Sequence, residues 1–258
     1  MSDAALTPHE PNPGAMRFRF ELDPVEEVVP WGEQRRLHWF GLTQGHYCMD
    51  IGGVGLLKYT QDHSTRDARS WVDYYVVRLW EDLLAVLPSA LEPVPEDLAH
   101  FFAANSAHWV DTDDPRTDAA TDAYGLRWTD TAHLRYGPSF RWWRTLAPED
   151  TITVAWHHPL DPDGEIEFSA PPSGRRTIPT TEFLAAVTDF DRRLLDAMRE
   201  RIDQLTETGV AEGIELDIPA LIEEQAQRRT WLPRALASQD LTDWPAVRTG
   251  VAILSPSH

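Results

Sequence analysis

A long amphipathic segment between Pro179 and Gly209 constrains the fold most strongly. Thr180 is placed to cap a helix there, and Glu182 lies in the first turn, where negative charge is favourable. Seven apolar residues recur at helical spacing: Phe183, Val187, Phe190, Leu194, Met198, Ile202 and Leu205. This stripe is typical of core packing rather than of a cofactor-binding helix, so we predict a long helix packed on the core.

Alternating apolar and polar residues predict strands in two parts of the chain. The predicted strands are residues 16–22, a hairpin within 36–53, and residues 54–59, 126–129, 134–136, 140–143, 151–156 and 165–170. The turn sequence 161–164 joins the last two as a hairpin. Further helices are predicted at 71–87, ending at Pro88, at 96–104, and after Asp217-Ile218-Pro219.

Strands therefore cluster in two runs, each followed by helices. This order predicts an α+β class, with an antiparallel meander packed against a few helices and long helices near the C-terminus. The length of 258 residues suits one large domain, which we place at residues 16–254. Residues 1–15 are rich in Pro, Gly and acidic side chains, and we expect them to be a disordered lead-in.

The chain is strongly acidic, with 42 Asp and Glu against 23 Lys and Arg and a net charge of −19. This charge repels phosphate backbones and anionic lipids, so it disfavours nucleic-acid and membrane partners. It favours either a basic protein partner or a role of the charge in solubility alone. The single cysteine excludes an intrachain disulfide and suits the reducing cytoplasm. No apolar run is long enough to span a bilayer.

The stretch RLHWFGLTQGHYCMDIGG, residues 36–53, is the first candidate site. A three-residue turn closed by Gly45 would place His38 opposite Asp50, with His46 and Cys48 on the same face. Such a group could bind a soft metal ion or pair a thiolate with an imidazole. The alternative is a half-covered sheet face on which the His38 and Asp50 side chains simply form a hydrogen bond.

The tripeptide WWR provides the second candidate. In a strand, Trp143 would share a face with Arg141 and leave Trp142 on the other, so that an aromatic ring beside a guanidinium could stack on a ligand or a partner. The alternative is an arginine stem that covers a surface tryptophan. The predicted ligand-binding or partner-binding residues are therefore His38, Asp50, Trp143 and Arg144.

Other polar groups are predicted to be solvated. His157 and His158 end a strand before Pro159, and adjacent strand residues point to opposite faces, so a surface turn is expected there rather than a metal site. The aspartate-rich residues 110–123 lack the glycine of a calcium-binding loop, and we expect a solvated loop. The common nucleotide-binding, zinc-protease and hydrolase motifs are absent, so no catalytic residue, metal or cofactor is assigned.

Several stretches carry a family resemblance: PWGEQRRLHWFGLTQGHY, YYVVRLWEDLLAVLPSALEPVP, HLRYGPSFRWWR and TEFLAAVTDFDRRLLDAMRER. Through them the chain resembles an uncharacterised bacterial domain-of-unknown-function family that is common in actinobacteria. The resemblance implies a shared fold and supplies no activity. In that family, tryptophans stand where this chain has His46 and Cys48, which argues against a catalytic Cys48.

Two functions follow as hypotheses. The first is an acidic, cytoplasmic protein-interaction module, for example one of the toxin-immunity kind, which would bind a basic partner such as a nuclease toxin. The second is a small-molecule-binding protein or an enzyme with a pocket beside the aromatic sheet. The sequence leaves open whether the protein is an enzyme.

Overall fold

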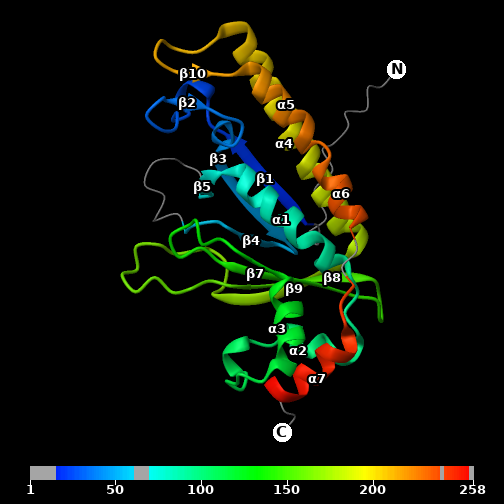
Figure 1. Ribbon diagram of the computed structural model, residues 1–258. Helices are drawn as coiled ribbons and strands as arrows, with labels where there is room; N and C mark the ends of the chain where they lie inside the picture. The colour runs from blue at the N-terminus through cyan, green and yellow to red at the C-terminus, as the bar shows by residue number, and fades with distance from the viewer. Residues whose placement is uncertain (1–15, 61–69, 239–240, 256–258) are drawn as a thin grey trace, which may run out of the picture.

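The structure is a computed structural model that describes residues 16–60, 70–238 and 241–255. It shows two antiparallel sheets with helices packed between and around them, and the predicted α+β class is confirmed (Figure 1). The predicted lead-in, residues 1–15, lies outside the described residues.

The first sheet is built around one long strand, β3 (Gln44–Ile51). On one side, β3 pairs with β1 (Arg17–Leu22), and on the other it pairs with β5 (Val72–Tyr75) and β4 (Val54–Leu56). All these pairings are antiparallel. Tyr47, Met49 and Ile51 are fully buried on the core-facing side of β3, as the alternation predicted.

The second sheet is a four-stranded antiparallel meander. Its order is β6 (Trp128–Asp130), β7 (Ser139–Thr145), β8 (Thr151–His157) and β9 (Ser173–Pro179). The predicted strands at 134–136 and 165–170 are wrong. The first is a turn in which Tyr136 adopts a positive φ, and the second forms only an isolated bridge between Tyr59 and Phe168. The true edge strand, β9, is mostly exposed and polar, so it lacks the alternation of a half-buried strand.

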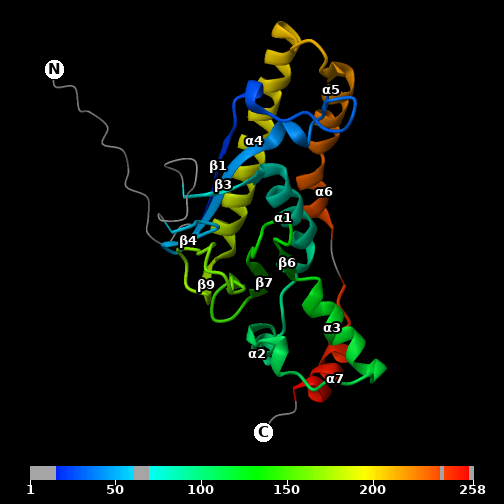
Figure 2. The same ribbon diagram turned by 90° about the vertical axis from the view of Figure 1, so that its left-hand side faces the viewer.

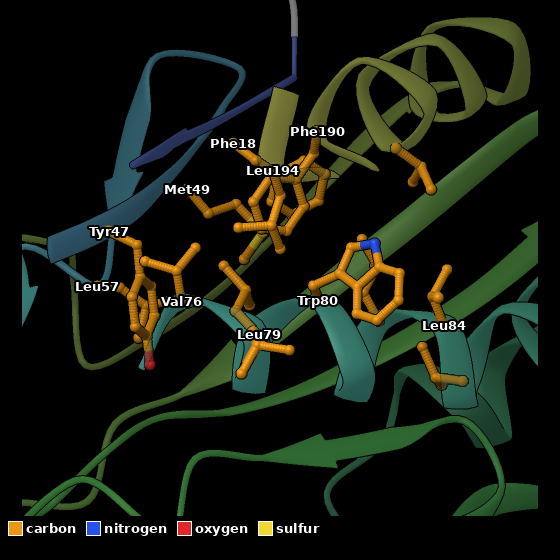
Figure 3. Close-up of a cluster of buried hydrophobic side chains, with 14 of the residues drawn as sticks. Phe18, Tyr47, Met49, Leu57, Val76, Leu79, Trp80, Leu84, Phe190 and Leu194 are labelled. Carbon is orange, nitrogen blue, oxygen red and sulfur yellow. The ribbon is translucent and has the colours of Figure 1, made fainter. Parts of the chain in front are cut away.

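Helices α1 (Val76–Leu91) and α4 (Thr180–Thr208) join the two sheets into one core (Figures 1 and 2). The seven predicted stripe residues of α4 are all buried, which confirms the long helix. Its cap differs from the prediction, because Pro179 holds the N-cap position and the Thr180 hydroxyl instead donates to Asp150 (2.6 Å). Figure 3 shows Phe190 and Leu194 of α4 facing Phe18 and Met49 of the first sheet.

The helix predicted at 71–87 is wrong at both ends. Residues 72–75 form β5, because pairing with β3 satisfies their backbone groups and overrides the helical pattern. At the other end, the helix continues through Pro88 to Leu91 and is closed by a bond from the Glu92 N–H to the Pro88 carbonyl (3.2 Å). Proline removes one helical hydrogen bond, and the last turn of α1 tolerates that loss.

A smaller second core lies on the far side of β7. The helices that enclose it with Trp143 are α2 (Ala99–Ala103), α3 (Asp118–Gly125) and α7 (Trp244–Leu254). The predicted solvated loop at 110–123 is therefore wrong in its second half, because Ala120 and Ala123 are buried on α3. Alanine is a strong helix former, but its small side chain gave no periodic signal among the aspartates.

The remaining elements are two helices, a two-stranded parallel sheet and short 3-10 turns. The helix predicted after Asp217 consists of α5 (Ile218–Arg228) and α6 (Trp231–Ala237), and Asp217 caps α5 through the Ala220 N–H (3.0 Å). Strand β10 (Glu215–Leu216) pairs in parallel with β2 (Arg36–Leu37). Short 3-10 turns are η1 (Val25–Glu27), η2 (Gly41–Thr43), η4 (Glu96–Leu98), η5 (Ser106–His108) and η6 (Pro115–Thr117).

Candidate interaction surface

The predicted hairpin at the first candidate site does not form. Phe40 has a helical backbone, η2 follows it, and β3 begins only at Gln44, so no strand carries His38 opposite Asp50. The partner of Asp50 across β1 is Arg17, and its partner across β4 is Gly55. The predicted register is wrong because β2 pairs with the distant β10, a contact that local turn chemistry does not reveal.

Asp50, His46 and Cys48 do share one face of β3, as predicted. Contacts and burial within the fold account for the Asp50 and Cys48 side chains. The Asp50 carboxylate forms ion pairs with Arg19 (2.7 Å) and Lys58 (2.8 Å). Cys48 is fully buried, and burial raises the pKa of its thiol to about 12. A thiol that stays protonated is a poor nucleophile and a poor metal ligand, so the thiolate–imidazole alternative loses its basis.

His38 belongs instead to a half-exposed aromatic cluster, which comprises Trp31, His38, Phe40 and Tyr75. The Trp31 ring lies edge-on to the rings of His38 (4.5 Å) and Tyr75 (5.3 Å), and its indole N–H donates to the Tyr75 hydroxyl (2.8 Å). The Gly41 N–H donates to Nδ1 of His38 (3.1 Å), and burial lowers the pKa of His38. The imidazole is therefore neutral at neutral pH, with its proton on Nε2. Trp31 remains 42% exposed, so the cluster presents an aromatic surface to solvent.

The second predicted site is also divided between two environments. Trp143 is buried in the second core rather than exposed on the sheet. Arg144 forms a two-pronged ion pair with Asp150 (2.7 and 2.6 Å) and donates to the Leu91 carbonyl (3.1 Å). The four predicted residues thus occupy separate places, and the structure does not bring them together.

Next to the aromatic cluster lies a group of titratable residues that the sequence did not single out. The buried Tyr47 hydroxyl is hydrogen-bonded to Nε2 of His133 (3.1 Å), and the His133 ring packs on Tyr74 (4.5 Å). Burial lowers the pKa of His133 to about 4, an effect that nearby Arg78 reinforces. Burial raises the pKa of Asp82 to about 6 against the opposing effect of Arg78. No short-range signal predicts this group, because Tyr47 and His133 are 86 positions apart.

An acidic groove, defined here by Glu21, Asp23, Glu26 and Glu27, lies where the loop after β1 meets α4. Its volume is about 560 Å³, and Arg201 and Gln204 of α4 form the opposite wall. The Arg201 guanidinium donates to the backbone carbonyls of Leu42 (2.7 Å) and Asp23, so its hydrogen bonds hold the wall together. The lining of the groove thus contains four acidic residues and one cationic residue.

The model of a family of unknown function, DUF5984, matches residues 17–250, which include both sheets and nearly all of the helices. The chain belongs to DUF5984. No curated protein and no solved structure matches this chain.

Within this DUF5984 fold, the described residues offer no group of three or more His, Cys, Asp and Glu side chains that could hold a metal ion. The aspartate-rich segment is used structurally, since Asp114 caps η6 by accepting from the Arg116 N–H (3.0 Å). In the described ranges, none of the helices has the length and apolar character needed to cross a membrane. The family match assigns no function, so the geometry of the surface is the basis for one.

Asp82 gives this region a testable pH dependence. Its folded pKa of about 6 exceeds its ordinary value of 3.8, so the folded state holds the proton more tightly than the unfolded state between these values. The contribution of Asp82 to stability therefore falls as pH rises from about 4 to 6. We expect the stability of Asp82→Asn relative to wild type to increase by about 2 kcal/mol across this window.

Urea denaturation of both proteins at pH 4, 5, 6 and 7 measures this difference. Asp122→Asn, an exposed residue of α3, is the matched control and should show no comparable change. Parallel curves for wild type and Asp82→Asn across the window would contradict the assignment.

Proposed function

We propose that this protein is an interaction module that binds a basic protein partner through its acidic groove and the adjoining aromatic cluster. The observation that carries the proposal is the position of exposed apolar side chains beside a concentration of carboxylates. Aromatic anchors provide most of the binding energy at protein interfaces, while surrounding charges steer the partner and select it.

The loop of residues 23–35 connects the two parts of this surface. It leads from the groove-lining Asp23 through η1 to Val29 and Trp31, which are 61% and 42% exposed. Gln44 fixes the loop over the start of β3, because its side chain accepts from the Val29 N–H (3.2 Å) and donates to Asp23 (3.0 Å). A partner that contacts the groove can therefore reach Trp31 along the same loop.

The surface next to the acidic groove is also negatively charged. Residues 202–227, which form the end of α4, β10 and most of α5, contain seven acidic residues and no Lys, Arg or His. These segments lie together at the top of Figure 1, on the same end of the molecule as β2. A negative surface of this extent raises the association rate of a positively charged partner and makes binding sensitive to salt.

A toxin-immunity role is one form of this function. An immunity protein must recognise and cover its toxin, and nuclease toxins carry basic surfaces because they act on phosphate backbones. The acidic end of the molecule, which carries the groove, is complementary to such a surface. The aromatic cluster would then supply the apolar centre of the interface.

The test begins with the small basic proteins encoded by reading frames beside this gene, each purified and titrated against the full-length protein by calorimetry. We expect one of them to bind, with an affinity that falls steeply between 50 and 300 mM salt. The variant Glu26→Lys/Glu27→Lys should weaken binding at least about tenfold, or ~1.4 kcal/mol.

Asp111→Lys/Asp113→Lys is the matched control, because both residues are exposed and precede α3 at the opposite end of the molecule (Figure 1). It makes the same change in net charge, so it should reproduce only the general charge effect. Equal weakening by the two variants would reject the acidic groove as the binding site. Absence of binding by every neighbouring basic protein would remove the support for the proposal.

A further inference from the structure

A second pocket, remote in sequence from the acidic groove, lies at the end of β8. Its volume is about 380 Å³, and most of its lining residues come from the loop that connects β8 to β9. Its walls include Thr60, His158, Asp161, Glu167, Phe168 and Pro171. The volume lies within the range of pockets that hold small molecules.

His158 is the unusual residue of this pocket. The sequence predicted a solvated turn for His157 and His158, and only His157 is exposed. His158 is 4% exposed, because its backbone N–H extends the ladder with β9 by donating to the Pro172 carbonyl (2.7 Å) and its ring packs on Phe168 (4.7 Å). The prediction failed because the loop that covers His158 is held by contacts far along the chain.

Neither ring nitrogen of His158 has a hydrogen-bond partner in the part of the chain that the structure describes. Burial, reinforced by the neighbouring His157, lowers the pKa of His158 to about 4. At neutral pH the ring is therefore uncharged and carries one donor and one acceptor nitrogen. Buried polar groups are almost always paired, so an unpartnered imidazole in a pocket wall indicates a ligand that completes it.

The other walls define what that ligand is. Phe168 and Pro171 provide flat apolar surfaces suited to an aromatic ring. The pocket also contains the Asp161 carboxylate. Burial opposes its ionisation, but hydrogen bonds from the N–H groups of Asp163 (3.0 Å), Ile166 (2.9 Å) and Glu165 (2.8 Å) outweigh this effect and lower the pKa of Asp161. The lining of the pocket thus combines a carboxylate with an uncharged imidazole.

We propose that this pocket binds a small, flat, cationic molecule of the aromatic amidine class. Its ring would lie against Phe168 and the prolines, one N–H would donate to the unprotonated nitrogen of His158, and the positive charge would lie near Asp161. Aromatic anions do not fit the same walls, because Asp161 and Glu167 both repel them. The proposal is independent of the basic partner proposed above.

Benzamidine and benzoate test this pocket as probes of nearly identical shape and opposite charge. Each is titrated into full-length protein labelled with ¹³C-histidine, and the ring resonances are followed by NMR. We expect benzamidine to shift the His158 resonance saturably with a millimolar dissociation constant. We expect benzoate to leave it unshifted.

Two variants locate the binding. His158→Phe keeps an aromatic ring against Phe168 and removes both nitrogens, so it should weaken benzamidine binding at least tenfold when followed by calorimetry. His157→Phe changes the adjacent exposed ring and should bind benzamidine like wild type. Should His158→Phe fail to fold, the comparison of the two probes on the wild-type resonance still decides the question. Equal shifts by both probes, no saturable shift, or unchanged binding by a folded His158→Phe would each overturn the proposal.

Discussion

Replacing Arg127 by methionine is expected to destabilise the protein by about 3–5 kcal/mol, the usual cost of removing one partner from a buried ion pair. Arg127 has a relative exposure of 0%, although it is a charged residue. Its guanidinium donates to Glu92 (2.8 Å) and to the Ala123 carbonyl (2.8 Å), and it packs over the Trp244 ring (5.2 Å). The substitution leaves the largely buried carboxylate of Glu92 without its cation.

Glu92 explains why the effect should extend beyond one contact. Its carboxylate also accepts from the Thr242 N–H (2.9 Å) and from the Thr242 hydroxyl. The same group therefore ties the end of α1 to the entry of β6 and to the segment before α7. Loss of Arg127 should loosen the second core from the first.

Urea denaturation followed by tryptophan fluorescence measures the change. Arg116→Met is the matched control, since Arg116 forms an ion pair with Asp114 while its side chain is 67% exposed, and it should cost less than about 1 kcal/mol. The double variant Arg127→Met/Glu92→Met should recover part of the stability, because it removes the unpaired charge as well. Similar costs for Arg127→Met and Arg116→Met would show that the buried pair contributes no more than a surface pair.

Physical causes explain which helices and strands could be predicted from the sequence. The long helix α4 was predictable because its seven apolar positions repeat with the helical period and a proline and a glycine mark its ends. Strand β1 was predictable for the related reason that its burial alternates between the two faces, and in β8 the residues Ile152, Val154 and Trp156 recur on one buried face. Local periodicity is sufficient where an element buries one face along its whole length.

The candidate sites depended on pairings between distant segments. His38 was expected to face Asp50, but the segment before it pairs with β10, which lies almost 180 positions further along the chain. The acidic groove required α4 to return to the loop after β1, and His158 became buried through the β8–β9 connection. Residue types in a local stretch cannot specify such neighbours, because turn chemistry fixes register only within one hairpin.

Replacing Phe190 by alanine should cost about 3–5 kcal/mol of stability, as expected when a large aromatic side chain is removed from a close-packed core. The Phe190 ring stacks on Phe18 of β1 (5.0 Å) and contacts Phe20 (5.7 Å), and its residue has an exposure of 0% (Figure 3). Leu241→Ala, at a residue 91% exposed, is the control and should change stability by less than about 0.5 kcal/mol.

The same substitution bears on the proposed function, because Phe190 holds α4 against β1 and α4 supplies one wall of the acidic groove. At a urea concentration or temperature where Phe190→Ala is still folded, its affinity for the basic partner should fall while the Leu241→Ala affinity stays unchanged. Phe190→Leu keeps part of the apolar volume and should lie between alanine and wild type in both stability and affinity. If Phe190→Ala lost stability but kept full affinity, the groove wall would not depend on this contact, and binding would have to rest on the loop of residues 23–35 alone.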